Sequence, residues 1–251
     1  MPVTGQKITD IKIYYCGYCT NQLRHIVKNW KSEKRQFPAA AVFFRHEGKA
    51  YLFDTGYSSR IFKNGWKSWI YQKLNPVSFE EEDKLVNQLA EDGIKPSEIN
   101  GIFLSHLHPD HIAGLCDFPA CPIILSSGSW KTLQAPKLLD LIFVNLLPED
   151  FQKRVQIVEL ENRVDFFGDG SLLLLDLTGH TDGQIGMFFP EYQTLYGADF
   201  CWGMDLLPLK MKLIARFFQK DYPSYQRTIE HVKEMQSAGV KVIVNHDKRS
   251  Y

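Results

Sequence analysis

Apolar and polar residues alternate along the chain in short runs, and the earliest clear runs predict a β-hairpin. Residues 39–56 read AAAVFFRHEGKAYLFDTG, in which two apolar, β-rich runs flank the turn sequence HEGK. Aromatic and β-branched residues on both sides of a polar, glycine-containing turn are typical of two antiparallel strands. The pattern therefore predicts a hairpin whose second strand ends at Asp54.

The segment after this hairpin changes from strand to helix periodicity. In residues 78–93, SFEEEDKLVNQLAEDG, Leu85 and Leu89 fall on one helical face. Ser78 followed three residues later by Glu81 matches a capping box, and a glycine at the far end is a common helix stop. We therefore predict a helix that starts after Ser78 and ends before Gly93.

A second amphipathic helix is predicted near the end of the chain, over residues 221–239. Tyr225, Ile229, Val232 and Gln236 recur there at helical spacing, and Gly239 follows as the stop. A stripe of this kind predicts an outer helix that packs one face on a sheet.

Four further apolar runs have the length of buried strands, and each leads to a histidine or an aspartate. They are INGIFLS at 99–105, SLLLLDLTG at 171–179, QTLYGAD at 193–199 and VKVIVNHD at 240–247, which lead to His106, His180, Asp199 and His246. Strands interleaved with helices predict an α/β fold, and such sheets place their sites where strands end. The length of 251 residues fits one domain over 1–251 better than two small ones.

Charge and composition limit the kinds of molecule that the protein is expected to bind. The chain has 29 Lys and Arg residues and 29 Asp and Glu residues, so its net charge of zero provides no global field for nucleic acid or an anionic membrane. No run approaches the roughly 18 apolar residues of a membrane span, and the opening MPVTGQKITD lacks the apolar core of a signal peptide. We expect a cytoplasmic protein that acts on a small molecule.

The cysteines do not suggest a disulfide framework. There are five, at positions 16, 19, 116, 121 and 201, an odd and sparse set for which we expect reduced thiols. The CGYC sequence at 16–19 has the spacing of a redox or zinc knuckle, but no second CxxC follows it. We expect these two cysteines to be small buried hydrophobic residues.

The largest concentration of histidine and aspartate lies directly after the strand at 99–105, in FLSHLHPDHIAGL. His106 and His108 are two residues apart on an extended segment and therefore point to the same side, whereas Asp110 and His111 turn toward a second position. Imidazole and carboxylate suit divalent metals such as zinc, and a catalytic metal needs three or four protein ligands. This loop supplies too few ligands for two cations, so we expect His180, Asp199 and His246 to supply the rest.

The remaining histidines carry no such pattern. His25, His46 and His231 stand alone in the sequence, and we expect them to be ordinary surface or core residues.

The order of these motifs resembles that of the metallo-β-lactamase superfamily. SHLHPDHIAGL, TGHTDG, YGADF and VNHD follow one another as in that family, and LFDTG matches its early aspartate motif. The resemblance implies an αββα sandwich with two divalent metal ions, Zn²⁺ first and Fe or Mn as alternatives. It implies that His106, His108 and His180 bind one ion, that Asp110, His111 and His246 bind the other, that Asp199 bridges them, and that Asp54 orients a ligand.

Within the superfamily the chain is most similar to the N-acyl homoserine lactonase branch. The β-lactamases use a cysteine on the second metal, and glyoxalase II enzymes continue into a helical domain where this chain stops five residues after His246. Those lactonases place a substrate-contacting tyrosine three residues after the bridging aspartate, where this chain has Trp202. The indole N–H of Trp202 remains a hydrogen-bond donor to substrate.

The resemblance predicts a metallo-hydrolase that attacks a lactone or carboxylic ester with hydroxide held by two metal ions, with Asp110 as the proton-transferring residue. Three alternatives stay open: a phosphodiesterase of the same fold, an iron-dependent oxidoreductase and a non-catalytic ligand-binding protein. Colour, metal content and turnover distinguish them.

Two segments rich in aromatic and basic residues, at 57–76 and 202–220, are expected to flank the site. They either favour an anionic or amphiphilic substrate or form a lid or a homodimer surface.

Overall fold

Two β-sheets form the centre of the protein in a computed structural model, which describes residues 7–63, 65–161, 163–207 and 209–247. The seven-stranded sheet has the order β4-β1-β2-β3-β5-β6-β7, and the five-stranded sheet has the order β12-β11-β10-β9-β8. The strands of the first sheet are β1 (Ile8–Gln22), β2 (Lys34–His46), β3 (Lys49–Phe53), β4 (Val77–Ser78), β5 (Ile99–Phe103), β6 (Ile123–Ser126) and β7 (Val155–Val158). The strands of the second are β8 (Arg163–Asp165), β9 (Leu173–Asp176), β10 (Ile185–Phe189), β11 (Thr194–Tyr196) and β12 (Lys241–Ile243).

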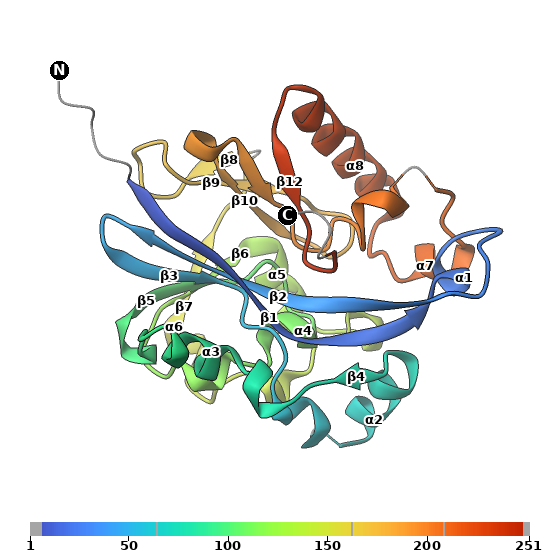
Figure 1. The fold of residues 1–251 in the computed structure, drawn as a ribbon, viewed down its shortest axis with the longest axis horizontal. Coiled ribbons are helices and arrows are strands. Elements are labelled where there is room, and N and C mark those ends of the chain that lie inside the picture. The colour runs from blue at the N-terminus through green and yellow to red at the C-terminus, as the bar shows by residue number, and fades with distance from the viewer. Residues whose placement is uncertain (1–6, 64, 162, 208, 248–251) are drawn as a thin grey trace.

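Helices cover the outer faces of both sheets. The helices are α1 (Leu23–Ile26), α2 (Gly65–Leu74), α3 (Leu85–Glu91), α4 (Pro109–Ile112), α5 (Ser127–Gln134), α6 (Phe151–Arg154), α7 (Leu213–Phe217) and α8 (Tyr222–Ser237). In Figure 1, α8 lies above the five-stranded sheet, and α3 and α6 lie below the seven-stranded one. Within the described ranges, no helix combines the length and the apolar character needed to cross a membrane.

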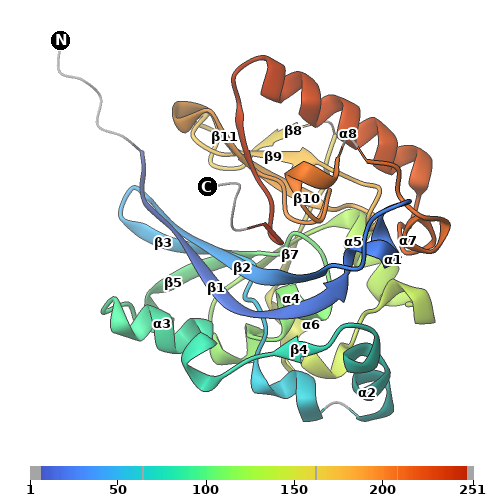
Figure 2. The ribbon, with the colours of Figure 1, turned by 45° about the vertical axis from the view of Figure 1, so that its right-hand side comes forward.

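Three hydrophobic clusters fill the three spaces between these layers. One cluster joins the seven-stranded sheet to α3 through residues such as Leu52 and Leu89. A second lies between the two sheets and contains Phe53 and Met187, and a third joins the five-stranded sheet to α8 and contains Val232. Because successive strand residues point to opposite faces, Leu52 and Phe53 serve different clusters. The layers therefore form the predicted αββα sandwich of the α/β class (Figures 1 and 2).

The predicted hairpin is confirmed, and it leads into the parallel part of its sheet. β2 and β3 pair antiparallel around a turn at Glu47 and Gly48, which both have positive φ. β3 pairs parallel with β5, β5 with β6, and β6 with β7. The strands predicted within 99–105, 171–179, 193–199 and 240–247 are also present, as β5, β9, β11 and β12.

The longest strand, β1, is absent from the sequence prediction. Its pairing with β2 shifts register between Thr9 and Lys12 and again between Tyr15 and Tyr18, so its side chains do not alternate regularly. Gly17 lies in the second irregularity with φ +79°, and a Cβ there would lie 2.8 Å from the carbonyl oxygen of Ser78. Glycine is therefore required where β4 approaches β1.

The CGYC cysteines lie within β1 as free thiols, as expected. Cys16 and Cys19 are both buried, and all five cysteines of the chain are unpaired. Burial raises the pKa of the Cys19 thiol to about 12 and raises the pKa of Cys16 as well. Because the thiolate is the reactive form, neither residue suits redox chemistry.

Two details of the predicted helices are wrong. Ser78 does not cap a helix, because it belongs to β4 and pairs with Tyr18. The chain instead forms a 3₁₀ turn at Glu81–Asp83, after which α3 begins at Leu85. In α8, Gln236 is exposed and Met235 packs on the core in its place, whereas Tyr225 and Val232 are buried as predicted.

Candidate metal centre

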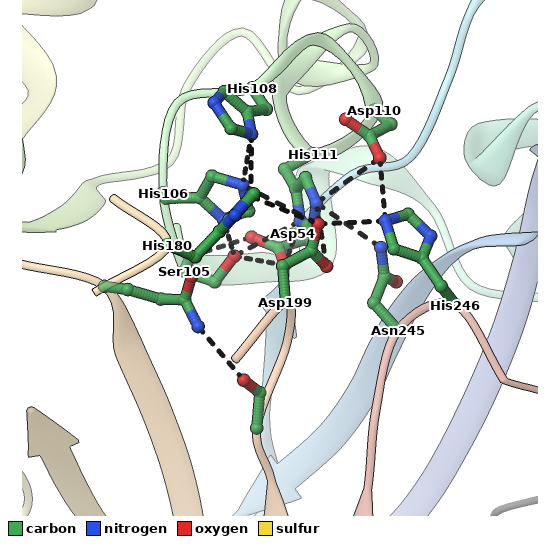
Figure 3. Close-up of polar contacts among 12 residues, drawn as sticks. Asp54, Ser105, His106, His108, Asp110, His111, His180, Asp199, Asn245 and His246 are labelled. Carbon is green, nitrogen blue, oxygen red and sulfur yellow. Dashed lines mark hydrogen bonds and ion pairs between the residues drawn. The ribbon is translucent and has the colours of Figure 1, made fainter. Parts of the chain in front are cut away.

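Strand ends bring the predicted ligands to one place. The loop after β5 carries His106 and His108, and Pro109 at the first position of α4 starts the single turn that carries Asp110 and His111. The segments that follow β9, β11 and β12 carry His180, Asp199 and His246. The parallel pairing of β11 with β12 puts Asp199 and His246 at the same sheet edge. Figure 3 shows all seven side chains converging.

Three imidazoles form the first group of potential ligands, which we call the imidazole group. His106 Nε2 lies 2.9 Å from His108 Nδ1, and His180 Nε2 lies 3.1 Å from the same atom. Asp199 Oδ2 lies 4.0 Å from His106 Nε2 and 3.7 Å from His180 Nε2. These four residues offer ligand atoms that all lie within 4.8 Å of one another.

The second group, which we call the carboxylate group, consists of Asp110, His111 and His246. Asp110 Oδ2 lies 3.5 Å from Nε2 of both histidines. Asp199 belongs here too, because its Oδ2 lies 2.9 Å from His246 Nε2 and its Oδ1 lies 3.4 Å from His111 Nε2. Asp199 is therefore shared between the two groups, as Figure 3 shows from its central position.

Hydrogen bonds hold the outer ring nitrogens of four histidines. Each of these nitrogens, Nδ1, lies within hydrogen-bond distance of an oxygen of the protein, so that Nε2 of each ring faces the centre. The donor and acceptor pairs are His106 with Ser105 Oγ at 3.0 Å, His111 with Asp54 Oδ2 at 2.8 Å, His180 with Gln219 Oε1 at 3.0 Å, and His246 with the Pro38 carbonyl at 2.7 Å. The rings are thus oriented before any ion binds.

Asp54 lies where the sequence placed it, against a predicted ligand. Besides the bond from His111, its carboxylate accepts the backbone N–H of Ser105 at 2.8 Å and the Ser105 hydroxyl at 2.7 Å. Asp54 adopts a left-handed backbone with φ +63°, which is uncommon for a residue with a side chain. This conformation directs the carboxylate across from β3 to the loop after β5.

Sequence reasoning missed four groups that orient the ligands. Ser105 and Asn245 each directly precede a predicted ligand, so the sequence could have indicated them. The Asn245 amide lies 3.3 Å from His111 Nε2. Gln219 and the Pro38 carbonyl lie 39 and 208 positions from the histidines they bond. No local pattern marks them, because only the packing of α7 and β2 brings them to the site.

The two groups differ in their electrostatics. Burial lowers the pKa of His106 and His108 well below the usual value, and it also lowers the pKa of His180. Burial opposes protonation of His111 too, but the carboxylates of Asp54, Asp110 and Asp199 raise the pKa of His111 well above its usual value.

Asp199 and His246 stabilise each other's charge in the same way. Burial would lower the pKa of His246, yet Asp199 raises it. Burial would raise the pKa of Asp199, yet His246 and His111 hold it well below its usual range.

The donor set fits divalent metal ions. Nitrogen and carboxylate oxygen ligands, four to a group, suit zinc and related metals. Asp199 Oδ1 is buried and has no hydrogen-bond partner among the described residues, which is costly for a carboxylate oxygen unless a cation binds it. The residues present therefore fit the metal ions that the sequence implies.

The other histidines lie away from this centre. His25 and His231 are exposed. His46 is buried, stacks on Phe167 with ring centroids 3.6 Å apart, and bonds Asp169 at 2.9 Å. His46, Glu47 and Asp169 could also hold an ion by their spacing, but Asp169 is already paired with Lys7 at 2.9 Å.

Trp202 lies between the metal centre and a neighbouring cavity. Its ring meets the ring of His180 edge to face, with centroids 5.9 Å apart. The cavity beside it has a volume of about 300 Å³ and is lined in part by Arg216 and Tyr222. The guanidinium of Arg216 lies 4.7 Å from the Tyr222 ring centre, and its Nε is buried without a hydrogen-bond partner in the described structure.

Comparisons with known proteins identify the family of the chain. The model of the metallo-beta-lactamase superfamily matches residues 35–234. The cytochrome P450 monooxygenase mpaDE' of Penicillium brevicompactum is 28% identical over 194 residues, which are 62% of this chain and 23% of that protein. The chain thus spans about a quarter of the length of that relative.

Two comparisons with lactonases cover a larger share of the compared protein's length. The N-acyl homoserine lactonase AttM of Rhizobium radiobacter is 23% identical over 187 residues, which are 70% of each chain. A solved N-acyl homoserine lactone hydrolase, with its product bound at the catalytic metal centre, superposes with a TM-score of 0.77 at 19% identity over 97% of this chain and 95% of that one. The chain therefore belongs to the metallo-β-lactamase superfamily.

Proposed function

We propose that this protein hydrolyses a lactone or a carboxylic ester at a centre of two divalent metal ions, Zn²⁺ in the first instance. The observation that carries the proposal is the pair of four-ligand groups that share Asp199. His106, His108 and His180 would hold one ion, and Asp110, His111 and His246 the other. When bound, two such ions would activate water near neutral pH and polarise the carbonyl group that is attacked.

The protein's own residues orient this chemistry. Hydrogen bonds to oxygens of Asp54, Ser105, Gln219 and Pro38 fix the ring nitrogens, so the ligands need little rearrangement when ions bind. Burial excludes water from the ligand side chains, since none is more than 9% exposed. Electrostatic interactions are therefore stronger here than at the surface.

Asp110 is the residue that we assign to proton transfer. Asp110 is the one carboxylate of the second ligand group that the imidazole group does not share. Ring opening of a lactone produces an alkoxide that must gain a proton, and a carboxyl group beside the reacting bond can deliver it.

We assign the non-reacting part of the substrate to the region of the site next to Trp202. Its indole presents a donor near His180, and Arg216 offers a cationic group with an unpartnered nitrogen in the adjoining cavity. An ester with an anionic or bulky substituent fits this arrangement better than a small neutral lactone does.

A substrate panel combined with metal analysis tests the proposal. Protein purified without chelator should hold about two transition-metal ions per chain and should hydrolyse lactones or carboxylic esters, with weak activity on acyl homoserine lactones because Trp202 stands where a tyrosine is expected. One ion per chain after reconstitution would contradict the dinuclear centre. A preference for phosphodiesters over every carboxylic ester would contradict the assigned bond, and a coloured iron form that consumes oxygen would point to an oxidoreductase.

A further inference from the structure

Exposed hydrophobic side chains are concentrated in three segments of the surface. Among the described residues, all large exposed hydrophobic side chains except Ile157 and Tyr192 lie within 62–74, 138–144 and 213–218. We call the exposed side chains of these three segments the apolar rim. The most exposed are Leu213 at 73%, Leu138 at 68%, Phe217 at 66%, Trp66 and Trp69 at 62% and Ile214 at 59%.

The three segments lie side by side although they are far apart in the sequence. Tyr71 of α2 packs on Phe143 with ring centroids 5.7 Å apart, which joins the first segment to the second. Lys220, which follows α7, bonds Asp140 at 2.6 Å and joins the third. α2 and α7 lie on the same side of the molecule in both views, on the right in Figures 1 and 2.

The apolar rim also has an excess of basic residues. Its three segments contain Lys63, Lys67, Lys73 and Arg216 and one acidic residue, Asp140, which bonds Lys220 at 2.6 Å. On α2, the Lys67 ammonium lies 6.0 Å from the Trp66 ring centre, and that of Lys73 lies 5.6 Å from the Trp69 ring centre. A net charge of zero for the whole chain thus conceals a local positive excess.

We infer that the apolar rim docks on an anionic lipid surface. Tryptophan prefers the boundary between headgroups and acyl chains, leucine and phenylalanine insert just below it, and lysine binds the anionic headgroups. All three kinds of side chain alternate on the rim. A second copy of this chain fits less well, because a symmetric dimer would set the same basic patch against itself.

Docking in this way places the metal centre close to the lipid. Gln219 lies two residues beyond Phe217 and orients His180, so the rim and the imidazole group are joined through one short segment. The docking itself does not depend on the reaction proposed above and can be measured without a substrate.

Sedimentation with lipid vesicles tests the inference on the full chain. The protein should sediment with vesicles of phosphatidylglycerol and phosphatidylcholine, should bind pure phosphatidylcholine vesicles far less, and should be released by high salt. Absence of sedimentation with the anionic vesicles would overturn the inference.

Matched variants distinguish specific docking from non-specific adsorption to lipid. Lys67→Gln and Lys73→Gln should weaken binding about fivefold each, and Trp66→Ala with Trp69→Ala should weaken it as well. Ile157→Ala and Lys153→Gln, which change exposed residues outside the rim, should leave it unchanged. Equal losses in rim and control variants would contradict the assigned surface. A dimer that forms without lipid and is abolished by the tryptophan variants would show that the occupant is a second copy.

Discussion

The imidazole group and the carboxylate group share Asp199 and part of one loop, yet they carry different charge. In the imidazole group, burial lowers the pKa values of His106, His108 and His180, so these rings are neutral at neutral pH. In the carboxylate group, neighbouring carboxylates raise the pKa values of His111 and His246, which favours the protonated rings when no cation is bound. The imidazole group is therefore a set of neutral nitrogen donors. The carboxylate group is a set of ion pairs, and a metal ion that binds there would have to displace their protons.

This difference shows that a single HxHxDH motif supplies residues to two unlike groups of potential ligands. His106 has one carboxylate within 4.0 Å, that of Asp199, whereas the His111 ring contacts three, those of Asp54, Asp110 and Asp199. The contrast can be tested by changes that affect one group and leave the other intact.

The largest effect should come from removing one ligand of either group. His180→Ala and His246→Ala should each abolish turnover and lower the metal content, because each removes a donor that only one group uses. The expected loss exceeds the roughly 10–100-fold typical of changes to residues that merely orient a ligand. Elemental analysis and steady-state rates measure both effects. His25→Ala and His231→Ala, at exposed positions, are the matched controls and should change neither; full activity in His246→Ala would exclude that residue from the site.

A smaller effect should follow from Asp110→Asn. The amide keeps the shape of the side chain but cannot carry a proton, so kcat should fall by about 10²-fold or more while KM changes little. Because Asp110 belongs to the carboxylate group alone, rates must be compared at matched metal occupancy. An unchanged kcat under those conditions would leave Asp110 as a ligand only.

Changes to the orienting bonds should separate the two groups more finely. Gln219→Ala removes the acceptor that orients His180, and Asp54→Asn alters the one that orients His111. Each should weaken metal binding about 10–100-fold in its own group only. Gln219→Glu, which keeps an acceptor for His180, should bind metal nearly as well as the wild type. Stepwise metal titration measures this, and a loss of equal size at both steps would refute the separation.

The mildest test follows the protons released when metal binds at neutral pH. The raised pKa values of His111 and His246 favour protons on these rings while no cation is present, so a cation that enters the carboxylate group is expected to displace them. A cation that enters the imidazole group meets neutral rings and should release almost none. An indicator dye in weakly buffered solution should record protons during one of the two binding steps, and equal release in both would contradict the charge assignment.

The local pattern of the sequence predicted most of the fold, and its errors have a common cause. The strands that lead to His106, His180, Asp199 and His246 are regular apolar runs, and each forms where expected. β1 was missed because its two irregularities break the alternation that identifies a strand. Ser78 matched a helix cap, but pairing with Tyr18 drew it into β4 instead. Local propensity gave way to tertiary contacts in both places.

Imidazole and carboxylate side chains at strand exits can be read from the sequence, and they limit what such a chain can bind. Tertiary packing brings Gln219 and the Pro38 carbonyl to two of the histidines and sets α2 and α7 on the same side of the molecule (Figures 1 and 2). Those relations join residues separated by tens to hundreds of positions. Packing of the two sheets and their helices sets such distances, and no local periodicity encodes them.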